Sequence, residues 1–182
     1  TSGKILRMTS TGGVPAGNPF GNLVWAYGIR NSFGFTFDPT TQFLWQTENG
    51  PACNDELNRI VPGGNYGWGP TQTCASPPSP PLNTNRDGPS PVLPLAFYTP
   101  TTAPTGVAFC SGCGVPDLEG RLVYGTFNTR QLRAVTLTTD RTGVVSETPV
   151  YTHSAGILSV ERAPDGGVYF SDASGIYRLT GA

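Results

Sequence analysis

The residues of this chain that are best suited to chemistry gather between positions 30 and 68. They are Arg30 and Asn31, then Glu48-Asn49-Gly50-Pro51, then Asp55-Glu56-Leu57-Asn58, then Gly63-Gly64-Asn65-Tyr66-Gly67-Trp68. Only 13% of the 182 residues are charged, so a cation and several carboxylates in one glycine-rich stretch are typical of a site carried by loops. An arginine fork suits an anionic ligand. Carboxylates ahead of a turn that exposes carbonyl oxygens suit a calcium ion.

Short antiparallel strands must position these residues. The chain has 24 glycines and 18 prolines among many Val, Thr, Phe and Tyr, a single Met, and no long stretch with apolar residues at helical spacing. This composition favours strands joined by frequent turns, and we expect an all-β fold. The expected strands cover residues 33–37, 43–46, 105–109, 121–124, 158–162 and 167–170.

A short phrase with an aliphatic residue, an arginine and a second aliphatic residue recurs after these strands. It occurs as Ile5-Leu6-Arg7-Met8, Leu57-Asn58-Arg59-Ile60, Leu132-Arg133-Ala134-Val135 and Ile176-Tyr177-Arg178-Leu179. Repetition of one small antiparallel unit at a spacing of tens of residues indicates a β-propeller with four-stranded blades. We count about three blades, with a leading strand over residues 4–8 that closes an earlier unit.

Three blades cannot close a ring, and an open arc leaves sheet faces uncovered. We therefore expect residues 1–182 to form the C-terminal part of one larger propeller domain. The expected partner is the N-terminal half of the same propeller or a second chain that completes the ring. Residues 75–94 are rich in proline, and we expect a surface-loop insertion there because proline cannot donate to a sheet.

The four cysteines form a distant pair, Cys53 and Cys74, and a close pair, Cys110 and Cys113. Two disulfides are the preferred interpretation, since the count is even and both pairs lie in turn-rich segments. A structural zinc site that uses all four cysteines is an alternative. A thioredoxin-like redox role is weaker, because no βαβ pattern surrounds the close pair.

Charge and hydropathy limit the function classes. The formal net charge is -1 and the pI is about 5.7, so a nucleic-acid partner is not expected. No apolar run is long enough to cross a bilayer. The chain begins at Thr1, from which we expect an N-terminus that was processed, cloned or left out. Disulfides would place the protein in the periplasm, at the cell surface or outside the cell.

The ordered motifs resemble the glucose/sorbosone dehydrogenases, which are six-bladed propellers that use pyrroloquinoline quinone (PQQ) and calcium to oxidise sugars. The resemblance covers nearly the whole chain, as the C-terminal half of such a ring. It rests on Gly3-Lys4-Ile5-Leu6-Arg7, Asn18-Pro19-Phe20, Tyr27-Gly28-Ile29-Arg30-Asn31, Glu48-Asn49-Gly50-Pro51, Asp55-Glu56-Leu57-Asn58 and Gly64-Asn65-Tyr66-Gly67-Trp68. The implied fold is about three blades of a six-bladed ring, and the implied substrate is a sugar.

The resemblance implies roles for single residues around the quinone. Arg30 and Asn31 match the family's Arg-Asn pair that contacts the cofactor, and a planar guanidinium can grip carboxylates and carbonyl oxygens in register. Asn49 belongs to the neighbouring motif and is assigned to the cofactor with them. Thr101 lies near a Thr that contacts the cofactor in the family.

The resemblance also implies two calcium positions. The backbone carbonyls of Gly50 and Pro51 match the pair that holds the calcium of the cofactor. The side chain of Glu56 and the carbonyl of Tyr66 match a second calcium site that braces the loop, with Asp55 beside it. Carboxylate and carbonyl oxygens are suitable ligands in both cases.

The chain departs from the family at three cationic positions. Where sugar-oxidising members carry Arg-x-Arg-Asp-Val, this chain has Gly156-Ile157-Leu158-Ser159-Val160, and a family Lys is replaced by Asn128 or a neighbour. Each lost charge-assisted hydrogen bond removes about 1.5–3 kcal/mol. The family's general-base His lies in the N-terminal half, so the resemblance assigns no catalytic residue here, and we expect these residues alone to be inactive.

Two functions stay open at this point. The first is the C-terminal half of a sugar dehydrogenase that oxidises the anomeric carbon of an aldose with PQQ and calcium. The second is a calcium-braced propeller without catalysis, which binds a glycan or another protein because its cofactor site is degraded.

Several residues also have alternative interpretations that involve no ligand. Arg30 and Asn31 could tie one blade to the next, with Arg30 neutralised by Glu48, and the carboxylates of Asp55 and Glu56 could cap backbone amides. His153 is expected to be an exposed or partly packed loop residue without an orienting carboxylate. The aromatic residues expected to pack between blades are Trp25, Trp45, Trp68 and Tyr169.

Overall fold

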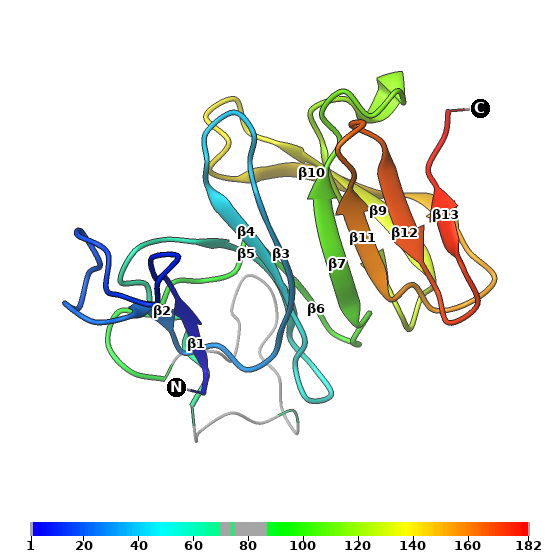
Figure 1. Cartoon of the computed structure of the whole chain (residues 1–182). Coiled ribbons are helices and arrows are strands. Elements are labelled where there is room, and N and C mark those ends of the chain that lie inside the picture. The colour runs from blue at the N-terminus through cyan, green and yellow to red at the C-terminus, as the bar shows by residue number, and fades with distance from the viewer. Residues whose placement is uncertain (1, 70–73, 75–86, 182) are drawn as a thin grey trace.

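Antiparallel strands make up nearly all of the regular structure. The computed structural model describes residues 2–69, 74 and 87–181 (Figure 1). The strands are β1 (Lys4–Leu6), β2 (Val24–Tyr27), β3 (Ser32–Phe37), β4 (Leu44–Glu48), β5 (Asp55–Ile60), β6 (Ala96–Tyr98), β7 (Pro104–Phe109), β8 (Leu122–Thr126), β9 (Gln131–Leu137), β10 (Val144–Thr152), β11 (Ser159–Arg162), β12 (Val168–Ser171) and β13 (Ile176–Arg178), with one 3-10 turn, η1 (Pro116–Leu118). The expected all-β fold is confirmed.

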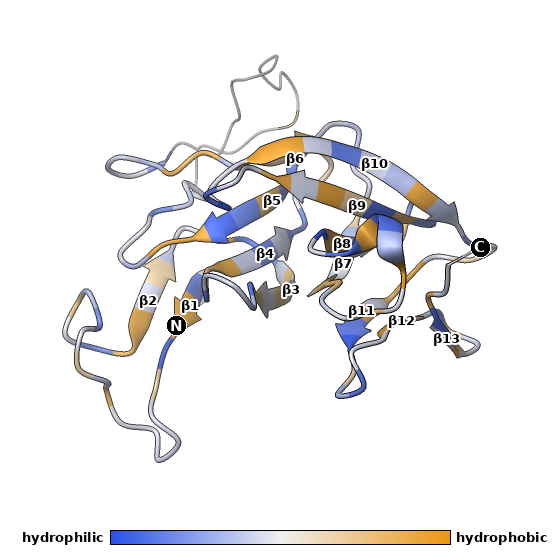
Figure 2. Cartoon of the chain, turned by 90° about the horizontal axis from the view of Figure 1, so that it is seen from above, coloured by the Kyte–Doolittle hydropathy of each residue, from blue (hydrophilic) through white to orange (hydrophobic). Residues whose placement is uncertain are grey.

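The strands form four antiparallel sheets, each made from consecutive segments of the chain. Their orders are β1-β2, β3-β4-β5-β6, β7-β8-β9-β10 and β11-β12-β13. The first strands of three sheets, β3, β7 and β11, lie side by side, and β6 and β10 lie on the outside (Figure 2). This is the expected arc of propeller blades, with two complete four-stranded blades among the described residues.

Two glycines allow the inner strands to approach one another. A Cβ on Gly34 of β3 would lie 2.7 Å from the carbonyl oxygen of Thr105, and a Cβ on Gly106 would lie 2.2 Å from the nitrogen of Val160. No larger residue fits such distances without a shift of the backbone. The hydroxyl of Thr47 also donates to the Thr105 carbonyl at 2.5 Å, so β4 and β7 are joined at the same level.

Each pair of neighbouring sheets encloses its own apolar core. Between the β3–β6 sheet and the β7–β10 sheet, the buried residues are Trp45, Leu57, Val107, Phe109, Leu122, Tyr124 and Val135. β4 is buried on both faces because it lies between two such cores. Trp45 therefore packs between blades as expected, and Trp25 is half-buried against a neighbouring core. Tyr169 lies instead under Arg178, with the guanidinium 5.8 Å from its ring centre.

Polar contacts also join the second and third sheets. Arg141, in the turn after β9, forms an ion pair with the fully buried Asp38 of the turn after β3. At the outer edge, the hydroxyls of Tyr98 and Tyr124 both donate to the carboxylate of Glu147, each at 2.5 Å. Tyr98 belongs to one sheet and the other two residues to the next, so the network connects two blades.

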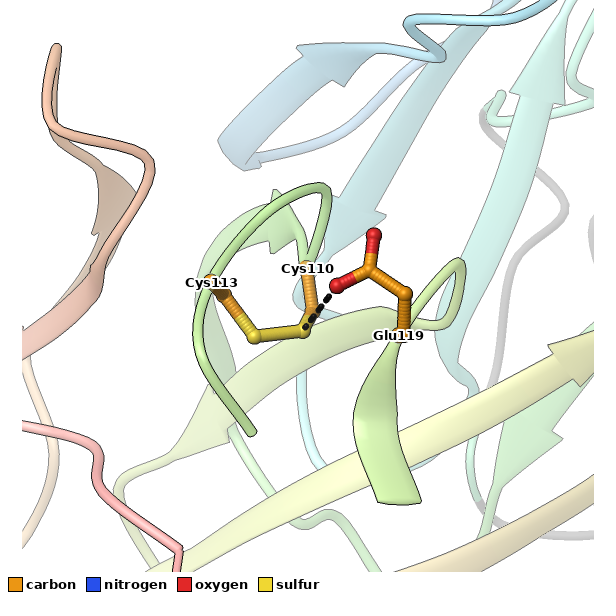
Figure 3. Close-up of side chains that lie close together, drawn as sticks. All are labelled: Cys110, Cys113 and Glu119. Carbon is orange, nitrogen blue, oxygen red and sulfur yellow. Dashed lines mark hydrogen bonds between the residues drawn. A yellow bond between two sulfur atoms is a disulfide. The ribbon is translucent and has the colours of Figure 1, made fainter. Parts of the chain in front are cut away.

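Both expected disulfides are present. Cys53 pairs with Cys74 and Cys110 with Cys113, with Cα separations of 5.6 and 5.1 Å. A carboxylate oxygen of Glu119 lies 3.9 Å from the sulfur of Cys110 (Figure 3). These three residues are the group of possible metal ligands that stands out among the described residues. Because the sulfurs are bonded to each other, no thiolate is left, and the zinc alternative with four cysteines is wrong.

Part of the expected proline-rich insertion lies outside the described residues. Residues 75–86 belong to that part, and residues 87–94 contain no strand. The insertion therefore stays a prediction. Within the described residues, no helix has the length and apolar character that crossing a membrane requires.

Candidate functional site

Three loops from two blades meet at one end of the sheets, and they carry most of the predicted site residues. The amide of Asn49 donates to the carbonyl of Asn31 at 3.0 Å, which joins the loop after β4 to the loop before β3. The side chain of Asn49 donates to the carbonyl of Pro104 at 3.0 Å, which joins the same loop to β7. The structure thus brings the Arg30-Asn31, Asn49-Gly50 and 101–104 segments together. We call the place where these three segments meet the loop junction.

Arg30 is exposed, and two backbone carbonyls fix its guanidinium. One guanidinium nitrogen donates to the carbonyl of Asn49 at 2.8 Å and to that of Gly50 at 2.9 Å. The guanidinium also lies over the ring of Trp68, 5.5 Å from its centre, a cation–π arrangement. Two carbonyl oxygens from adjacent residues therefore converge on one position that a positive charge occupies.

The backbone at Gly50 requires glycine. A Cβ at this residue would lie 1.8 Å from the carbonyl oxygen of Cys53, a distance that no real side chain adopts. The close turn is what directs the Gly50 carbonyl toward Arg30. Pro51 follows on the exposed part of the loop. The structure thus brings the Gly50 carbonyl to the junction, and the metal role of both residues stays a prediction.

Asp55 joins two of the loops through its side chain. One carboxylate oxygen accepts the amide of Gly50 at 2.9 Å, and the other accepts the amide of Ala103 at 2.7 Å. Burial raises the pKa of this carboxyl, and the amides of Ala103 and Gly50 oppose that rise. Both oxygens are already used, so the amide-capping interpretation describes Asp55 in this structure, and its metal role stays a prediction.

Glu48 fixes the Arg30 segment from inside the sheet. One of its carboxylate oxygens accepts the backbone amide of Arg30 at 2.6 Å, and the other accepts the side-chain amide of Gln46 at 3.2 Å. Burial raises the pKa of the carboxyl to about 7. The expected pairing of Glu48 with Arg30 thus takes the form of a backbone hydrogen bond. This hydrogen bond fixes the backbone of Arg30, while its guanidinium stays free to donate to the carbonyls of Asn49 and Gly50.

Glu56 lies beside Glu48, because the two residues face each other in the register of β4 and β5. It is buried, and its carboxylate accepts the side-chain amide of Asn58 at 2.9 Å. Tyr66 is also buried, with its hydroxyl donating to the carbonyl of Arg59 at 2.6 Å. Glu56 therefore lies inside the sheet rather than on an exposed loop. Its role and that of the Tyr66 carbonyl toward calcium stay predictions.

Thr101 receives the side chain of Asn128. The Asn128 amide donates to the carbonyl of Thr101 at 3.2 Å and to its hydroxyl at 3.3 Å. Asn128, which the resemblance gives together with its neighbours as the replacement of a family Lys, therefore lies next to a predicted cofactor contact. Ile157, in the segment that replaces the family's arginines, is fully buried in the core between the last two sheets. At these positions the chain thus has neutral side chains where the resemblance implies cationic ones.

A pocket of about 520 Å³ opens beside Arg30. Its lining includes Lys4, Tyr27, Arg30, Trp68 and Asp87. Volumes of this order hold small organic ligands. The lining combines the cationic residues Lys4 and Arg30 with the acidic residue Asp87 and two aromatic residues, which suits a polar, ring-shaped ligand.

His153 differs from the expectation. It is 8% exposed, and its Nε2 lies 2.9 Å from the carboxylate of Asp172. Its ring packs edge-on against Phe170 and Tyr177. The orienting carboxylate comes from a different blade, so no local motif could reveal it. None of the contacts described for His153 reaches the loop junction, and the pair joins the last two sheets instead.

Comparison with known proteins places these observations in a family. Residues 1–178 match the family model described as Glucose / Sorbosone dehydrogenase. The chain is 37% identical over 177 residues to the uncharacterized protein slr1608 of Synechocystis, covering 92% of this chain and 42% of that protein. It is 29% identical over 177 residues to aldose sugar dehydrogenase YliI of Escherichia coli, covering 92% of this chain and 47% of that protein.

A solved structure gives the same result for the fold. The PQQ-bound form of aldose sugar dehydrogenase from Streptomyces coelicolor superimposes with a TM-score of 0.74 at 27% identity, covering 97% of this chain and 51% of that chain. The chain therefore spans about half the length of the relatives that it matches.

Proposed function

This chain belongs to the glucose/sorbosone dehydrogenase family, and on that premise we propose that it is the C-terminal half of a sugar dehydrogenase propeller. The proposed reaction is oxidation of the anomeric carbon of an aldose, with PQQ as cofactor and calcium as its companion ion. One observation supports this most directly: the carbonyls of Asn49 and Gly50 converge on the position held by the Arg30 guanidinium.

The donor set fits a calcium ion. Adjacent backbone carbonyls on a constrained turn are hard oxygen ligands of the kind that Ca²⁺ prefers. In this structure the Gly50 carbonyl accepts the guanidinium of Arg30, so calcium would take this oxygen when the fork of Arg30 turns to the quinone. The proposed ligands of the cofactor calcium are the carbonyls of Gly50 and Pro51. A second ion would use Glu56 and Tyr66, with Asp55 as the brace between loops.

The donor set also fits a carboxylated quinone, provided that calcium is bound. Arg30 and Ca²⁺ together carry enough positive charge to balance a tricarboxylate, although the family's other cations are absent. Asn31, Asn49 and Thr101 would supply neutral hydrogen bonds, and Asn128 lies beside Thr101. We therefore expect cofactor binding to depend more strictly on calcium here than in members that keep the additional arginines.

The residues of this chain would bind and orient, and the bound quinone would supply the two-electron oxidation of the sugar. The planar fork of Arg30 would grip the cofactor, with Trp68 stacked against it and Glu48 holding its backbone. Asp55 would keep the 101–104 segment at a fixed distance from Gly50. The proton acceptor would come from the other half of the propeller.

The location and partner belong to the same proposal. Two disulfides support an oxidising compartment, such as the periplasm or the cell exterior. Coverage of about half of each relative supports a propeller completed by another half, which we propose as the partner.

The test is cofactor binding by the chain assembled with the remainder of the propeller. Calorimetric titration of PQQ with millimolar calcium should show saturable binding that chelation abolishes, and an aldose should then reduce an electron-accepting dye. Absence of quinone binding both with calcium and after chelation would contradict the proposal that the protein is a dehydrogenase. Calcium-dependent binding of a glycan without quinone binding would favour the non-catalytic module.

A further inference from the structure

Phe127 is an exposed aromatic residue at the same end of the sheets as the loop junction. It follows β8 directly, and its backbone amide donates to the carbonyl of Ala103 at 2.8 Å. The amide of Ala103 in turn donates to the carboxylate of Asp55, which also holds Gly50. Phe127 is 50% exposed. It therefore lies at the rim of the proposed site, although the proposed reaction gives it no role so far.

The turn that carries Phe127 is fixed by hydrogen bonds. The hydroxyl of the fully buried Thr126 accepts the backbone amide of Gln131 at 2.9 Å, which closes the turn. The backbone amide of Asn128 donates to the carbonyl of Thr102 at 3.0 Å, which ties the turn to the 101–104 segment. A side chain on a fixed turn loses little conformational freedom when a ligand binds to it.

Gly156, which precedes the next blade, leaves room for the ring of Phe127. A Cβ on Gly156 would lie 2.4 Å from the Cδ2 atom of the ring, so the ring packs directly against the glycine backbone. The amide of Ile157 donates to the carbonyl of Thr126 at 3.3 Å and holds the glycine beside the turn. The position of the ring thus depends on the absence of a side chain at residue 156.

The exposure of Phe127 does not result from a missing sheet. The ring lies where the β7–β10 sheet meets the β11–β13 sheet, and both sheets belong to the described residues. Single exposed apolar residues are common on protein surfaces. Phe127 is distinguished from them by its fixed turn, by its packing on Gly156 and by its place at the rim of the proposed site.

The surroundings of the ring are neutral. The three segments beside it contain no charged residue: 101–103, 127–129 and 155–158. Asn128 is exposed, and its side chain contacts the hydroxyl of Thr101 at 3.3 Å. The guanidinium of Arg130, at the end of the turn, donates to the carbonyl of Ser154 at 3.3 Å.

This chemistry favours an uncharged ring over a carboxylated one. Carboxylates are bound most strongly by charge-assisted hydrogen bonds, which the three neutral segments cannot supply. A sugar ring can place its C–H groups on an aromatic face and its hydroxyls on neutral amides and hydroxyls at the edge. The rim at Phe127 therefore suits the sugar, whereas Arg30 suits the quinone.

We propose that Phe127 is a specificity-determining residue that stacks against the ring of the aldose, with Gly156 holding the aromatic ring in place. This inference rests on the proposed function for the identity of the ligand. The position of the ring and its dependence on Gly156 follow from the contacts of these two residues.

The experiment measures KM and kcat for D-glucose, and the Kd of PQQ, with the calcium-loaded assembled propeller. Phe127→Ala should raise KM about tenfold, since an aromatic contact of this kind contributes up to about 1.5 kcal/mol. The variant should leave kcat and the Kd of PQQ unchanged, because the ring acts on substrate binding alone. Phe127→Trp keeps an aromatic face and should restore most of the affinity for glucose.

Gly156→Ala supplies a second variant, because its methyl group would displace the ring of Phe127. It should raise KM as Phe127→Ala does. In the double variant the two losses should not add, because no ring is left for the methyl group to displace. Val145→Ala, at a residue of β10 that is 65% exposed, is the control and should leave KM unchanged. Thermal unfolding checks that every variant is folded.

An active wild-type protein whose KM is unchanged by Phe127→Ala would overturn the inference, as would additive losses in the double variant. A weaker affinity for PQQ with unchanged KM would assign the ring to the quinone and overturn it too. A wild-type protein that binds no quinone would contradict the proposed function. Calorimetric titration of glucose without quinone then tests Phe127 alone, and equal heats for the wild-type protein and Phe127→Ala would overturn the stacking contact.

Discussion

At the scale of single residues, Arg30 both holds the loop junction together and is the proposed contact of the cofactor. Its fork holds the carbonyls of Asn49 and Gly50 in one place, and its backbone is held by Glu48. The motif around Arg30 could be identified from the sequence, because residue type and order carry that information. The contacts of Glu48 and Asp55 could not, because they depend on the register of strands and on loops far apart in the chain.

Replacement of Arg30 by alanine should weaken PQQ binding in the presence of calcium. The loss of a charge-assisted bond of about 1.5–3 kcal/mol corresponds to about tenfold to a hundredfold in Kd. Arg30→Lys should recover only part of the affinity, since it keeps the charge and loses the planar fork. Calorimetry measures both, with Arg178→Ala as a control at an exposed arginine on β13. Equal affinities for the Arg30→Ala and Arg178→Ala variants would remove Arg30 from the site.

Replacement of Gly50 by alanine should disrupt the junction, because its Cβ would lie 1.8 Å from the Cys53 carbonyl. We expect a loss of about 3 kcal/mol in the free energy of unfolding, or about 10 °C in Tm, together with weaker calcium binding. Gly181→Ala is the matched control, since no atom lies within 4 Å of its Cβ position. Thermal unfolding with and without calcium measures the effect, and two variants with the same Tm would contradict it.

At the scale of elements, the inner strands were easier to predict than the outer ones. The apolar patterns of the sequence predict β3, β4, β7, β8, β11 and β12 within a few residues of their observed bounds. The outer strands β2, β6 and β10 were not located. β6 has only three residues, and β10 contains Pro149, which argues against a strand.

The ion pair between Arg141 and Asp38 should make blade packing sensitive to acid. Burial raises the pKa of Asp38, but the hydrogen bond from Arg141 and those at Thr40 and Thr41 outweigh it, so the pKa is lowered overall. A carboxyl with a lowered folded pKa stabilises the fold above its unfolded pKa of about 3.9, and this contribution is lost as the pH falls through the folded pKa.

Arg141→Met should therefore cost about 3 kcal/mol at neutral pH, because it leaves a buried carboxylate without its partner. The difference from the wild-type chain should shrink as the pH drops below about 4. Urea unfolding at several pH values measures this. A difference between the two proteins that is constant with pH would contradict the ionised pair.

The tyrosine network at the outer edge gives a second test of contacts between blades. Tyr98→Phe removes the hydroxyl that donates to Glu147 at 2.5 Å, and we expect a loss of about 2 kcal/mol because the acceptor is charged. Tyr169→Phe removes a hydroxyl that contacts the exposed Asp165 at 3.3 Å and should change stability little. Equal effects in chemical denaturation would show that the network does not stabilise the blade interface.

At the scale of the whole molecule, the open arc was predictable from the repeats. Three units cannot close a ring, and among the described residues Phe33, Phe35 and Phe37 of β3 are exposed and β1 pairs only with β2. The His153–Asp172 pair could not be predicted, because it forms where separate blades meet. Contacts of this kind depend on how blades are placed next to each other, which local patterns do not encode.

The most direct measurement is a crystal structure of the assembled propeller grown with calcium and PQQ. We predict anomalous density for calcium on the carbonyl oxygen of Gly50, and a quinone within hydrogen-bond distance of Arg30 and Asn31. Calcium density away from Gly50, or a quinone bound at another end of the blades, would contradict the central claim.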